Sequence, residues 1–106
     1  MTLAELKTEI AKLKIPYAYG YFGEKQPAKY IVYEETLRNV IFADGVEVYS
    51  EPWIVLRLVS KNRDLTAEAS ICAMLRENKF PYDDPEYFFD EEEGIHIATF
   101  YFSIGG

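Results

Sequence analysis

The sequence predicts an α+β domain, with a mainly antiparallel sheet of about five or six strands and two helices packed on one of its faces. The first observation is the order of patterns, because helical spacing gives way to several strand patterns, a second helical pattern and two more strand patterns. The second is the length of 106 residues, which suits one hydrophobic core rather than two. No repeat or low-complexity linker divides the chain, so we expect one domain over residues 1–106.

The N-terminal segment predicts a helix that begins with a capping box. The side chain of Thr2 can accept a hydrogen bond from a backbone amide of the first turn, and Glu5 can reach back to the amide of Thr2. Apolar residues then recur at helical spacing until Pro16, which is expected to end the run. These residues are Leu3, Leu6, Ile10 and Leu13.

Strand patterns dominate the part of the chain that follows this helix. Residues 17–22 alternate aromatic and small side chains, and residues 29–34 are rich in β-branched and aromatic ones, so both segments predict short strands. Residues 37–42 and 46–49 flank an Asp-Gly pair, which is a strong hairpin signal. We expect Pro52 to interrupt the strand pattern after this hairpin.

The most apolar stretch of the chain predicts a central strand. Residues 53–59 form a near-continuous apolar run, which favours a position covered on both faces of the sheet. Arg57 is the one charged residue in this run, and we expect it to reach an edge.

A second helix is predicted after this strand. Asp64 or Thr66 can cap its N-terminus, and Asn78 and Pro81 can end it. Its buried face is expected to carry Leu65, Ala69, Cys72 and Leu75, with Ile71 alongside.

Two further strands are predicted in the C-terminal part. Residues 87–89 form a short aromatic run, and residues 96–104 form a longer strand pattern. Gly94 separates the two, which is typical of a turn.

The composition favours a protein partner. The net charge of −7 repels phosphate at long range and argues against nucleic acid or an anionic membrane as a directly bound partner. Aromatic residues make up 16 % of the chain, and they serve either as interface anchors or as core. A single cysteine excludes an intrachain disulfide and fits synthesis in a reducing cytoplasm. No apolar run approaches the roughly 20 residues of a membrane helix, and the N-terminus lacks the apolar block of a signal peptide.

No catalytic, cofactor or metal signature is found. His96 is the only histidine and Cys72 falls on an apolar helix face, so a Cys-His-acid trio is no basis for a function. Structural zinc needs four cysteine or histidine ligands, and the chain has two such residues. The acidic segment 83–93 lacks the alternating ligands and central glycine of a calcium loop.

The order of landmarks along the chain is similar to that of a known protein family. A leucine-rich helix is followed by the segments IPYAY at 15–19, YIVY at 30–33 and ADG at 43–45, by Tyr49 and by an apolar strand. A second helix and the segment DEEEGIH at 90–96 then lead into an aromatic strand. This order resembles the tail-completion or tail-terminator (head-tail joining) proteins of long-tailed bacteriophages and of prophages of Gram-positive bacteria.

The resemblance implies a structural protein of the virion tail that is assembled in the cytoplasm of the bacterial host. Such proteins form a ring, typically of six copies, at the head-proximal end of the tail, where the ring ends the tail tube and joins tail to head. The implied partners are therefore further copies of the chain, the tail-tube protein and head-connector proteins. DNA can pass through the ring without sequence-specific binding, and an acidic wall suits this passage because it repels phosphate.

The resemblance carries no motif for the contacts between subunits, so the expected interface residues are hypotheses from the composition. They are the aromatic residues Tyr17, Tyr19 and Trp53 and the carboxylates Asp83, Asp84, Glu86, Asp90, Glu91, Glu92 and Glu93. The acidic segment either forms a loop that faces the lumen or the next ring, with Tyr87, Phe88 and Phe89 anchoring it to the sheet, or it is an ordinary solvated loop with its aromatic residues in the core.

Two other functions remain open at this point. An acidic DNA mimic or inhibitor would bind a nucleic-acid-processing protein, but it needs carboxylates spread at phosphate-like spacing, and here they concentrate in one segment. A small enzyme is disfavoured because no catalytic constellation is present, although single carboxylates and tyrosines can perform acid-base chemistry.

Overall fold

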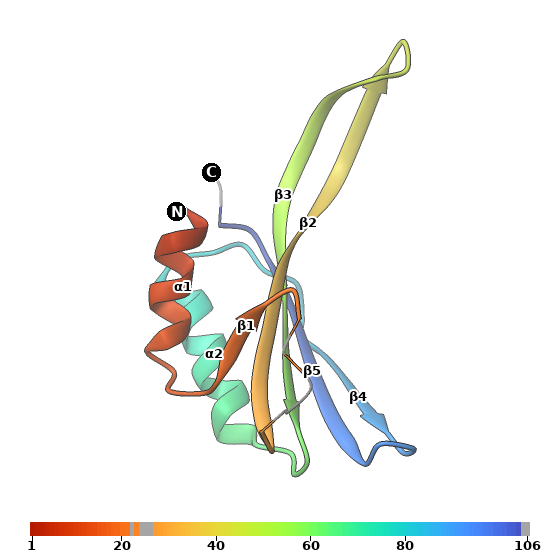
Figure 1. Cartoon of the computed structure of the whole chain (residues 1–106). Coiled ribbons are helices and arrows are strands. Elements are labelled where there is room, and N and C mark those ends of the chain that lie inside the picture. Colours follow the sequence, from red (N-terminus) through yellow and green to blue (C-terminus); the bar gives the residue numbers. More distant parts are fainter. Residues whose placement is uncertain (22, 24–26, 105–106) are drawn as a thin grey trace.

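The computed structural model describes residues 1–21, 23 and 27–104, and within them all side chains except those of residues 37–43 and 47–51. Two helices lie on one face of a five-stranded sheet (Figure 1), which confirms the predicted α+β class. In chain order the elements are α1 (Leu3–Ala11), β1 (Tyr17–Tyr19), β2 (Lys29–Ala43), β3 (Val46–Ser60), α2 (Leu65–Glu77), β4 (Glu86–Asp90) and β5 (Ile95–Phe102). None of the helices described is long and apolar enough to cross a membrane.

The sheet has the strand order β1-β2-β3-β5-β4. β1 runs parallel to β2, with Tyr17 opposite Ile31 and Tyr19 opposite Tyr33. The other three neighbouring pairs are antiparallel, so the sheet is mainly antiparallel as predicted. β1 and β4 therefore form the two opposite edges of the sheet.

α1 begins with the predicted capping box. Glu5 N–H donates to the Thr2 hydroxyl at 3.2 Å, and Thr2 N–H donates to the Glu5 carboxylate at 3.2 Å. The helix ends at Ala11 with Lys12 as its C-cap, before the expected end at Pro16. Lys14, in the left-handed region with φ 58, turns the chain between the helix and the proline.

α2 begins at the predicted cap but buries a different face. The Asp64 carboxylate accepts a hydrogen bond from Ala67 N–H at 2.9 Å, and Asn78 is the C-cap. The predicted face is correct for Ile71 and Leu75, which are buried, and Cys72 packs against the core, but it is wrong for Leu65, which is 65 % exposed, and for Ala69, which is also exposed. The buried residues are Ala67, Ile71, Met74 and Leu75. These residues follow the i, i+4, i+7, i+8 spacing of one helix face, which is centred on Ile71. The predicted face was centred one residue later, on Cys72. Because a helix turns by about 100° per residue, the observed face is rotated from the predicted one by about that angle.

β2 and β3 are longer than the sequence predicts. The two predicted strands at 29–34 and 37–42 are one continuous strand, and Pro52 does not interrupt β3 but lies opposite Leu37. The hydroxyl of Ser103 donates a hydrogen bond to the carbonyl of Pro52, so this carbonyl points away from β2. In a strand, the backbone nitrogen of a residue points to the same side as its carbonyl. The missing N–H of Pro52 therefore faces away from β2, so the ladder loses no hydrogen bond.

The core lies between the helices and one face of the sheet. Its largest fully buried side chains come from both helices and from the three middle strands: Leu6, Ile10, Ile71, Leu75, Ile31, Ile54, Leu56, Leu58, Phe100 and Phe102. β3 is central, as predicted, but the helices cover only one of its faces (Figure 1). Arg57 does not reach an edge: it lies on the other face, in the middle strand, and its guanidinium is 3.6 Å from the Glu34 carboxylate on β2.

Three strand ends also differ from their predictions. β1 ends at Tyr19 because Gly20 adopts φ 76 and donates its N–H to the carbonyl of Tyr33, and Phe22 lies outside the described residues. β4 spans Glu86–Asp90 and so contains the predicted run 87–89. β5 ends at Phe102, two residues before the predicted end, because the N–H of Ser103 donates to the carbonyl of Pro81.

Candidate protein-interaction site

The β2–β3 hairpin projects well beyond the rest of the sheet (Figure 1). β1 pairs with β2 only over residues 31–33, and β5 pairs with β3 only over residues 54–60. Between the Leu37–Pro52 pair and the turn, the two strands pair only with each other in the described chain. We call residues 37–52 the arm.

The arm changes the shape of the molecule. Its seven residues per strand span roughly 23 Å at about 3.3 Å per residue. The Cα radius of gyration is 15.0 Å, whereas a compact chain of this length has one of about 13 Å. The principal extents are 48 × 32 × 25 Å, so the molecule is elongated.

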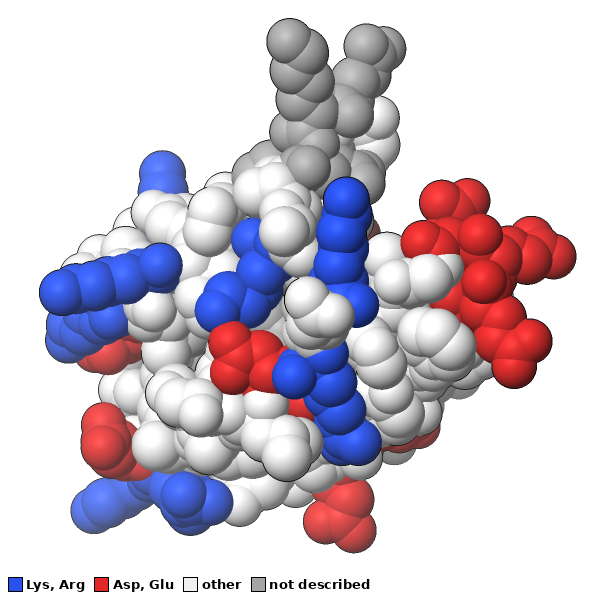
Figure 2. Space-filling view, turned by 90° about the horizontal axis from the view of Figure 1, so that it is seen from below, with Lys and Arg blue, Asp and Glu red and all other residues white. Residues whose placement is uncertain are grey.

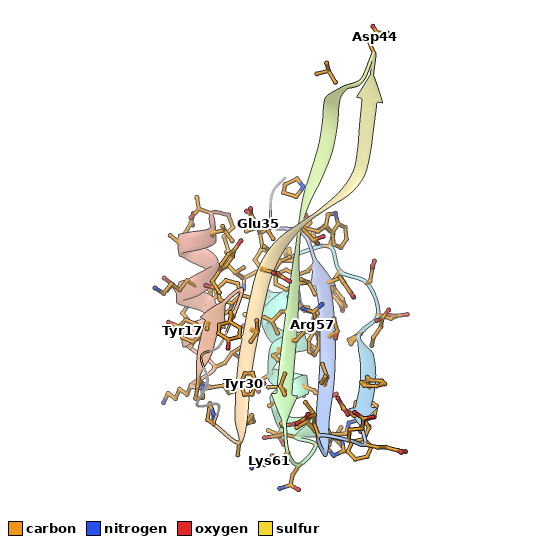
Figure 3. All side chains as sticks on the ribbon, turned by 45° about the vertical axis from the view of Figure 1, so that its right-hand side comes forward. Tyr17, Tyr30, Glu35, Asp44, Arg57 and Lys61 are labelled. Atoms are coloured by element: carbon orange, nitrogen blue, oxygen red, sulfur yellow. The ribbon has the colours of Figure 1, made fainter. Side chains whose placement is uncertain are left out.

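The tip of the arm is a tight turn with exposed residues. Asp44 and Gly45 have φ values of 53 and 77, and two consecutive positive φ angles are those of a type I′ turn, as the Asp-Gly pair predicts. Asp44 and Gly45 are exposed, and Val46 is 64 % exposed. Figure 3 shows Asp44 at the far end of the arm and Glu35 near its base. The tip thus presents one carboxylate beside one apolar side chain.

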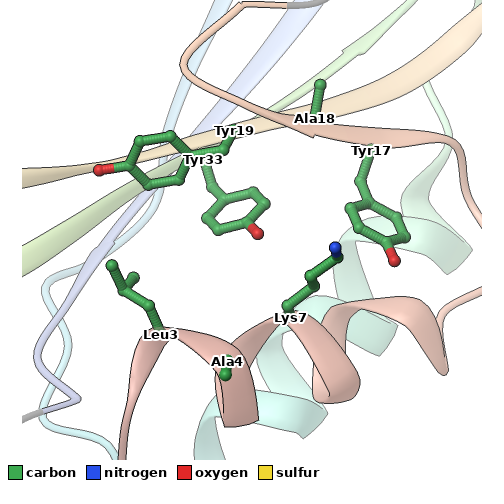
Figure 4. A pocket seen from close by; sticks show the side chains of 7 residues that line it. All are labelled: Leu3, Ala4, Lys7, Tyr17, Ala18, Tyr19 and Tyr33. Carbon is green, nitrogen blue, oxygen red and sulfur yellow. The ribbon is translucent and has the colours of Figure 1, made fainter.

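An open pocket lies between α1 and β1, near the base of the arm. Its volume is about 530 Å³. The lining residues, seen in Figure 4, are Leu3, Ala4, Lys7, Tyr17, Ala18, Tyr19 and Tyr33. Three phenol groups and one ammonium group therefore share a cavity whose remaining walls are apolar. We call it the tyrosine pocket.

The tyrosines of this pocket hold one another in place. Tyr19 and Tyr33 meet edge to face, with ring centroids 5.3 Å apart. The hydroxyl of Tyr19 accepts a hydrogen bond from Glu35 N–H at 3.3 Å, which ties the pocket to the strand that continues into the arm. Burial raises the pKa of the Tyr33 hydroxyl, and the neighbouring hydroxyls of Tyr17 and Tyr19 raise it further. The Tyr33 hydroxyl therefore keeps its proton and remains a hydrogen-bond donor.

Lys7 supplies the only cationic group in the lining of this pocket. Its side chain is exposed, and it takes part in none of the ion pairs among the described residues, whereas the ammonium of Lys12, the C-cap of the same helix, lies 3.1 Å from the Glu9 carboxylate. In Figure 4 the Lys7 ammonium points toward the space between Tyr17 and Tyr33. The pocket can therefore accept an anionic group together with an apolar one.

The acidic segment forms the opposite edge of the sheet and the turn beside it. Glu91, Glu92 and Glu93 are exposed in the β4–β5 turn. The Asp90 carboxylate accepts hydrogen bonds from the N–H groups of Glu92 and Glu93 at 3.0 and 3.2 Å, and Gly94 closes the turn with φ 66. Figure 2 shows a group of acidic side chains on one side of this end of the molecule, whereas Lys and Arg side chains and scattered acidic ones lie across the rest of the view.

The aromatic residues of β4 are anchored to the sheet by strand pairing but are not in the core. Tyr87, Phe88 and Phe89 are 43 %, 61 % and 43 % exposed, so the prediction that places them in the core is wrong. The Arg63 guanidinium lies 3.8 Å from the centroid of the Tyr87 ring. The Tyr87 hydroxyl is hydrogen-bonded to Nδ1 of His96, and Phe89 packs on the His96 ring at 4.7 Å.

The structure places the expected interface residues in three separate regions. Tyr17 and Tyr19 come together in the tyrosine pocket. Trp53 is 9 % exposed, at the base of the arm, where it lies opposite Thr36. The carboxylates lie on or beside β4, at the other edge of the sheet, and they are Asp83, Asp84, Glu86, Asp90, Glu91, Glu92 and Glu93.

Sequence reasoning missed Lys7, Tyr33 and the full length of the arm. Leu3 and Lys7 are four residues apart and so lie on one helix face, a spacing from which their shared position in the pocket could have been predicted. No sequence signal pairs Tyr19 with Tyr33, because their contact depends on the parallel register of β1 and β2.

The described residues show no site of familiar chemistry. No three His, Cys, Asp or Glu side chains in this part of the chain gather so that they could hold a metal ion. Cys72 packs against the core, while the His96 ring is held by Tyr87 and Phe89. Comparison of the chain with family models, with curated proteins and with solved structures gives no match.

Proposed function

We propose that this chain is a non-enzymatic assembly protein that binds further copies of itself through the arm and forms a closed ring. The observation that carries this proposal is the arm, whose strands pair only with each other in the described chain. A two-stranded hairpin on its own is marginally stable in water, so a projecting arm gains order when a partner surface covers it. An arm that binds a different surface of a neighbour makes a heterologous contact, which closes into a ring when the rotation between copies allows.

The order of landmarks along the sequence supports a specific setting for such a ring. It resembles that of phage proteins that end the tail tube and join tail to head, so we propose the head-proximal end of a virion tail as the location. The partners are then the tail-tube protein and head-connector proteins, with about six copies in the ring. The exposed Glu91, Glu92 and Glu93 suit a wall past which DNA slides, because they repel phosphate.

An acidic DNA mimic is the second candidate. The observation in its favour is the group of exposed carboxylates on and beside β4 (Figure 2). The arm has no role in that function, and Lys and Arg side chains lie beside the acidic group in the same view. The mimic therefore explains less of the molecule than the ring does.

Sedimentation velocity of a trimmed variant tests the proposal. Residues 37–52 are replaced by Asn-Gly, which joins Thr36 to Trp53, two residues that already face each other across the hairpin. We expect the full-length chain to form a concentration-dependent oligomer and the trimmed chain to sediment as a folded monomer. Near-ultraviolet circular dichroism and thermal melting of both chains check that trimming leaves the fold intact.

Two results would contradict the proposal. One is a full-length chain that stays monomeric at every concentration, and the other is a trimmed chain that associates as well as the full-length one. A salt-sensitive complex with a DNA-binding enzyme, formed equally by both chains, would support the mimic instead. Tail-tube protein polymerised with the full-length chain should give tubes that stop at one end, and the trimmed chain should not stop them.

A further inference from the structure

We infer that the tip of the arm of one copy inserts into the tyrosine pocket of the next copy, with the Asp44 carboxylate beside the Lys7 ammonium. This inference rests on the proposed self-assembly and names the surface that the arm binds. The occupant of the pocket is therefore a second copy of this chain.

The pocket has the chemistry to bind a carboxylate. The Lys7 ammonium is a cationic donor that takes part in none of the ion pairs among the described residues. The Tyr33 hydroxyl keeps its proton and also lines the cavity. A carboxylate placed between them would receive charge-assisted hydrogen bonds, which are about twice as strong as neutral ones.

The pocket also has the shape and the apolar walls that a turn needs. A volume of about 530 Å³ is in the range of protein pockets that enclose a small ligand. The side chain of Leu3 and the rings of Tyr17 and Tyr19 form apolar walls. Tyrosine is enriched among the residues that contribute most to protein-protein binding, because its ring is large, rigid and amphipathic.

The tip of the arm is the complementary surface on the same chain. Asp44 supplies an exposed carboxylate, and Val46 supplies an apolar side chain two residues later. Gly45 between them adds no side chain, and nothing lies within 4 Å of the Cβ position there, so the turn is narrow and unobstructed. This turn therefore carries one carboxylate and one exposed apolar side chain at the end of the arm, which are the two kinds of group that the tyrosine pocket can bind.

The arm of a copy cannot fill its own pocket. The pocket lies near the base of the arm, because Tyr19 bonds Glu35, whereas Asp44 lies at the opposite end (Figure 3). Tip and pocket are therefore different surfaces that meet only between copies. Such a contact is heterologous, and it leaves one free tip and one free pocket until a ring closes.

Complementation between two variants, each of which lacks one of the two binding surfaces, tests this inference. The first chain carries Lys7→Glu, which places a carboxylate in the pocket but leaves the tip intact. The second is the trimmed chain, which has an intact pocket and no tip. Lys12→Glu is the control, because it makes the same charge reversal at the C-cap of α1, outside the pocket lining.

The expected results follow from like-charge repulsion. Lys7→Glu should raise the concentration for half-association by about tenfold or more, and Lys12→Glu should change it by less than about threefold. Neither the Lys7→Glu chain nor the trimmed chain should associate alone at a concentration where the mixture forms a one-to-one complex. Asp44→Asn removes the tip charge while keeping a residue that tolerates positive φ, and it should weaken association in the same direction as Lys7→Glu.

The outcomes separate this inference from the proposed function. If the trimmed chain loses association but Lys7→Glu does not, the arm binds another surface and the inference is overturned, while the proposed function stands. If the mixture of the Lys7→Glu chain and the trimmed chain stays monomeric, the inference is likewise overturned. If the full-length chain never associates, both are overturned. Thermal melting of the Lys7→Glu chain, whose substitution is on the surface, distinguishes lost association from lost folding.

Discussion

The hydroxyl of Ser103 donates a hydrogen bond to the carbonyl of Pro52 at 3.3 Å, across 51 positions of the chain. This bond joins the segment after β5 to β3 at the point where the arm leaves the sheet. Ser103 is 4 % exposed whereas Pro52 is exposed, so this partly buried bond lies where the core meets the base of the arm.

The first prediction concerns this bond. Ser103→Ala should lower the free energy of unfolding by about 1 kcal/mol, because the partly buried hydrogen bond to the Pro52 carbonyl is lost. Self-association should not change, because the arm keeps its residues. Chemical denaturation and sedimentation velocity measure the two effects. A loss of association at unchanged stability would mean that Ser103 acts in the interface rather than in the body.

The second prediction concerns the face of α2 that packs on the sheet. Ile71→Ala should lower the free energy of unfolding by about 2 to 5 kcal/mol, because Ile71 is fully buried in the core. Leu65→Ala is the control, and it should change that free energy by less than about 0.5 kcal/mol because Leu65 is 65 % exposed. The reverse order of the two effects in a urea titration would contradict the buried face described here.

The third prediction concerns pH. The pKa of the Asp64 carboxyl is lowered, first by the hydrogen bond from the Lys29 ammonium and then by that from Ala67 N–H. A carboxyl whose pKa is lower in the folded chain adds stability above its ordinary pKa, and this contribution disappears as the pH falls through the folded value. Asp64→Asn keeps a good helix cap but removes the charge.

The wild-type chain should therefore be more stable than Asp64→Asn at pH 7, and the difference should shrink as the pH falls below about 4. Denaturation curves of both chains at a series of pH values provide the measurement. A stability difference that is constant with pH would show that the charge of Asp64 contributes nothing.

The fourth prediction concerns the acidic turn. Replacing Glu91, Glu92 and Glu93 by serine should leave the melting temperature nearly unchanged, because Asp90 and Gly94 make the turn. In the proposed ring the same change should impair the joining of tails to heads. Counting joined particles after mixing purified heads and tails measures this effect. Unimpaired joining would remove the acidic turn from the proposed function.

Local signals predicted the parts of the fold that depend on neighbouring residues. The capping box of Thr2 and Glu5, the Asp64 cap and the Asp44-Gly45 turn all arise from hydrogen bonds or φ angles within a few residues. Such features can be predicted from a sequence because they do not depend on contacts with distant segments of the chain.

Features that depend on distant segments could not be predicted. Pro52 fits inside β3 only because its backbone faces Ser103 rather than β2, and that depends on where the chain beyond β5 returns. The tyrosine pocket depends on the parallel register that sets Tyr19 beside Tyr33. The sequence left open whether the aromatic residues of β4 lie in the core, and they are exposed on a strand whose position at the edge of the sheet depends on distant segments.

Hydrogen exchange of the arm as a function of protein concentration tests the central claim most directly. If neighbouring copies cover the arm, amide protection at residues 38–43 and 46–51 should rise as the concentration passes through the range of association. Protection in β5, which is paired on both sides within the sheet, should stay constant and serves as the internal reference. Arm amides that exchange at the same rate at every concentration, in a chain that nonetheless associates, would contradict the account.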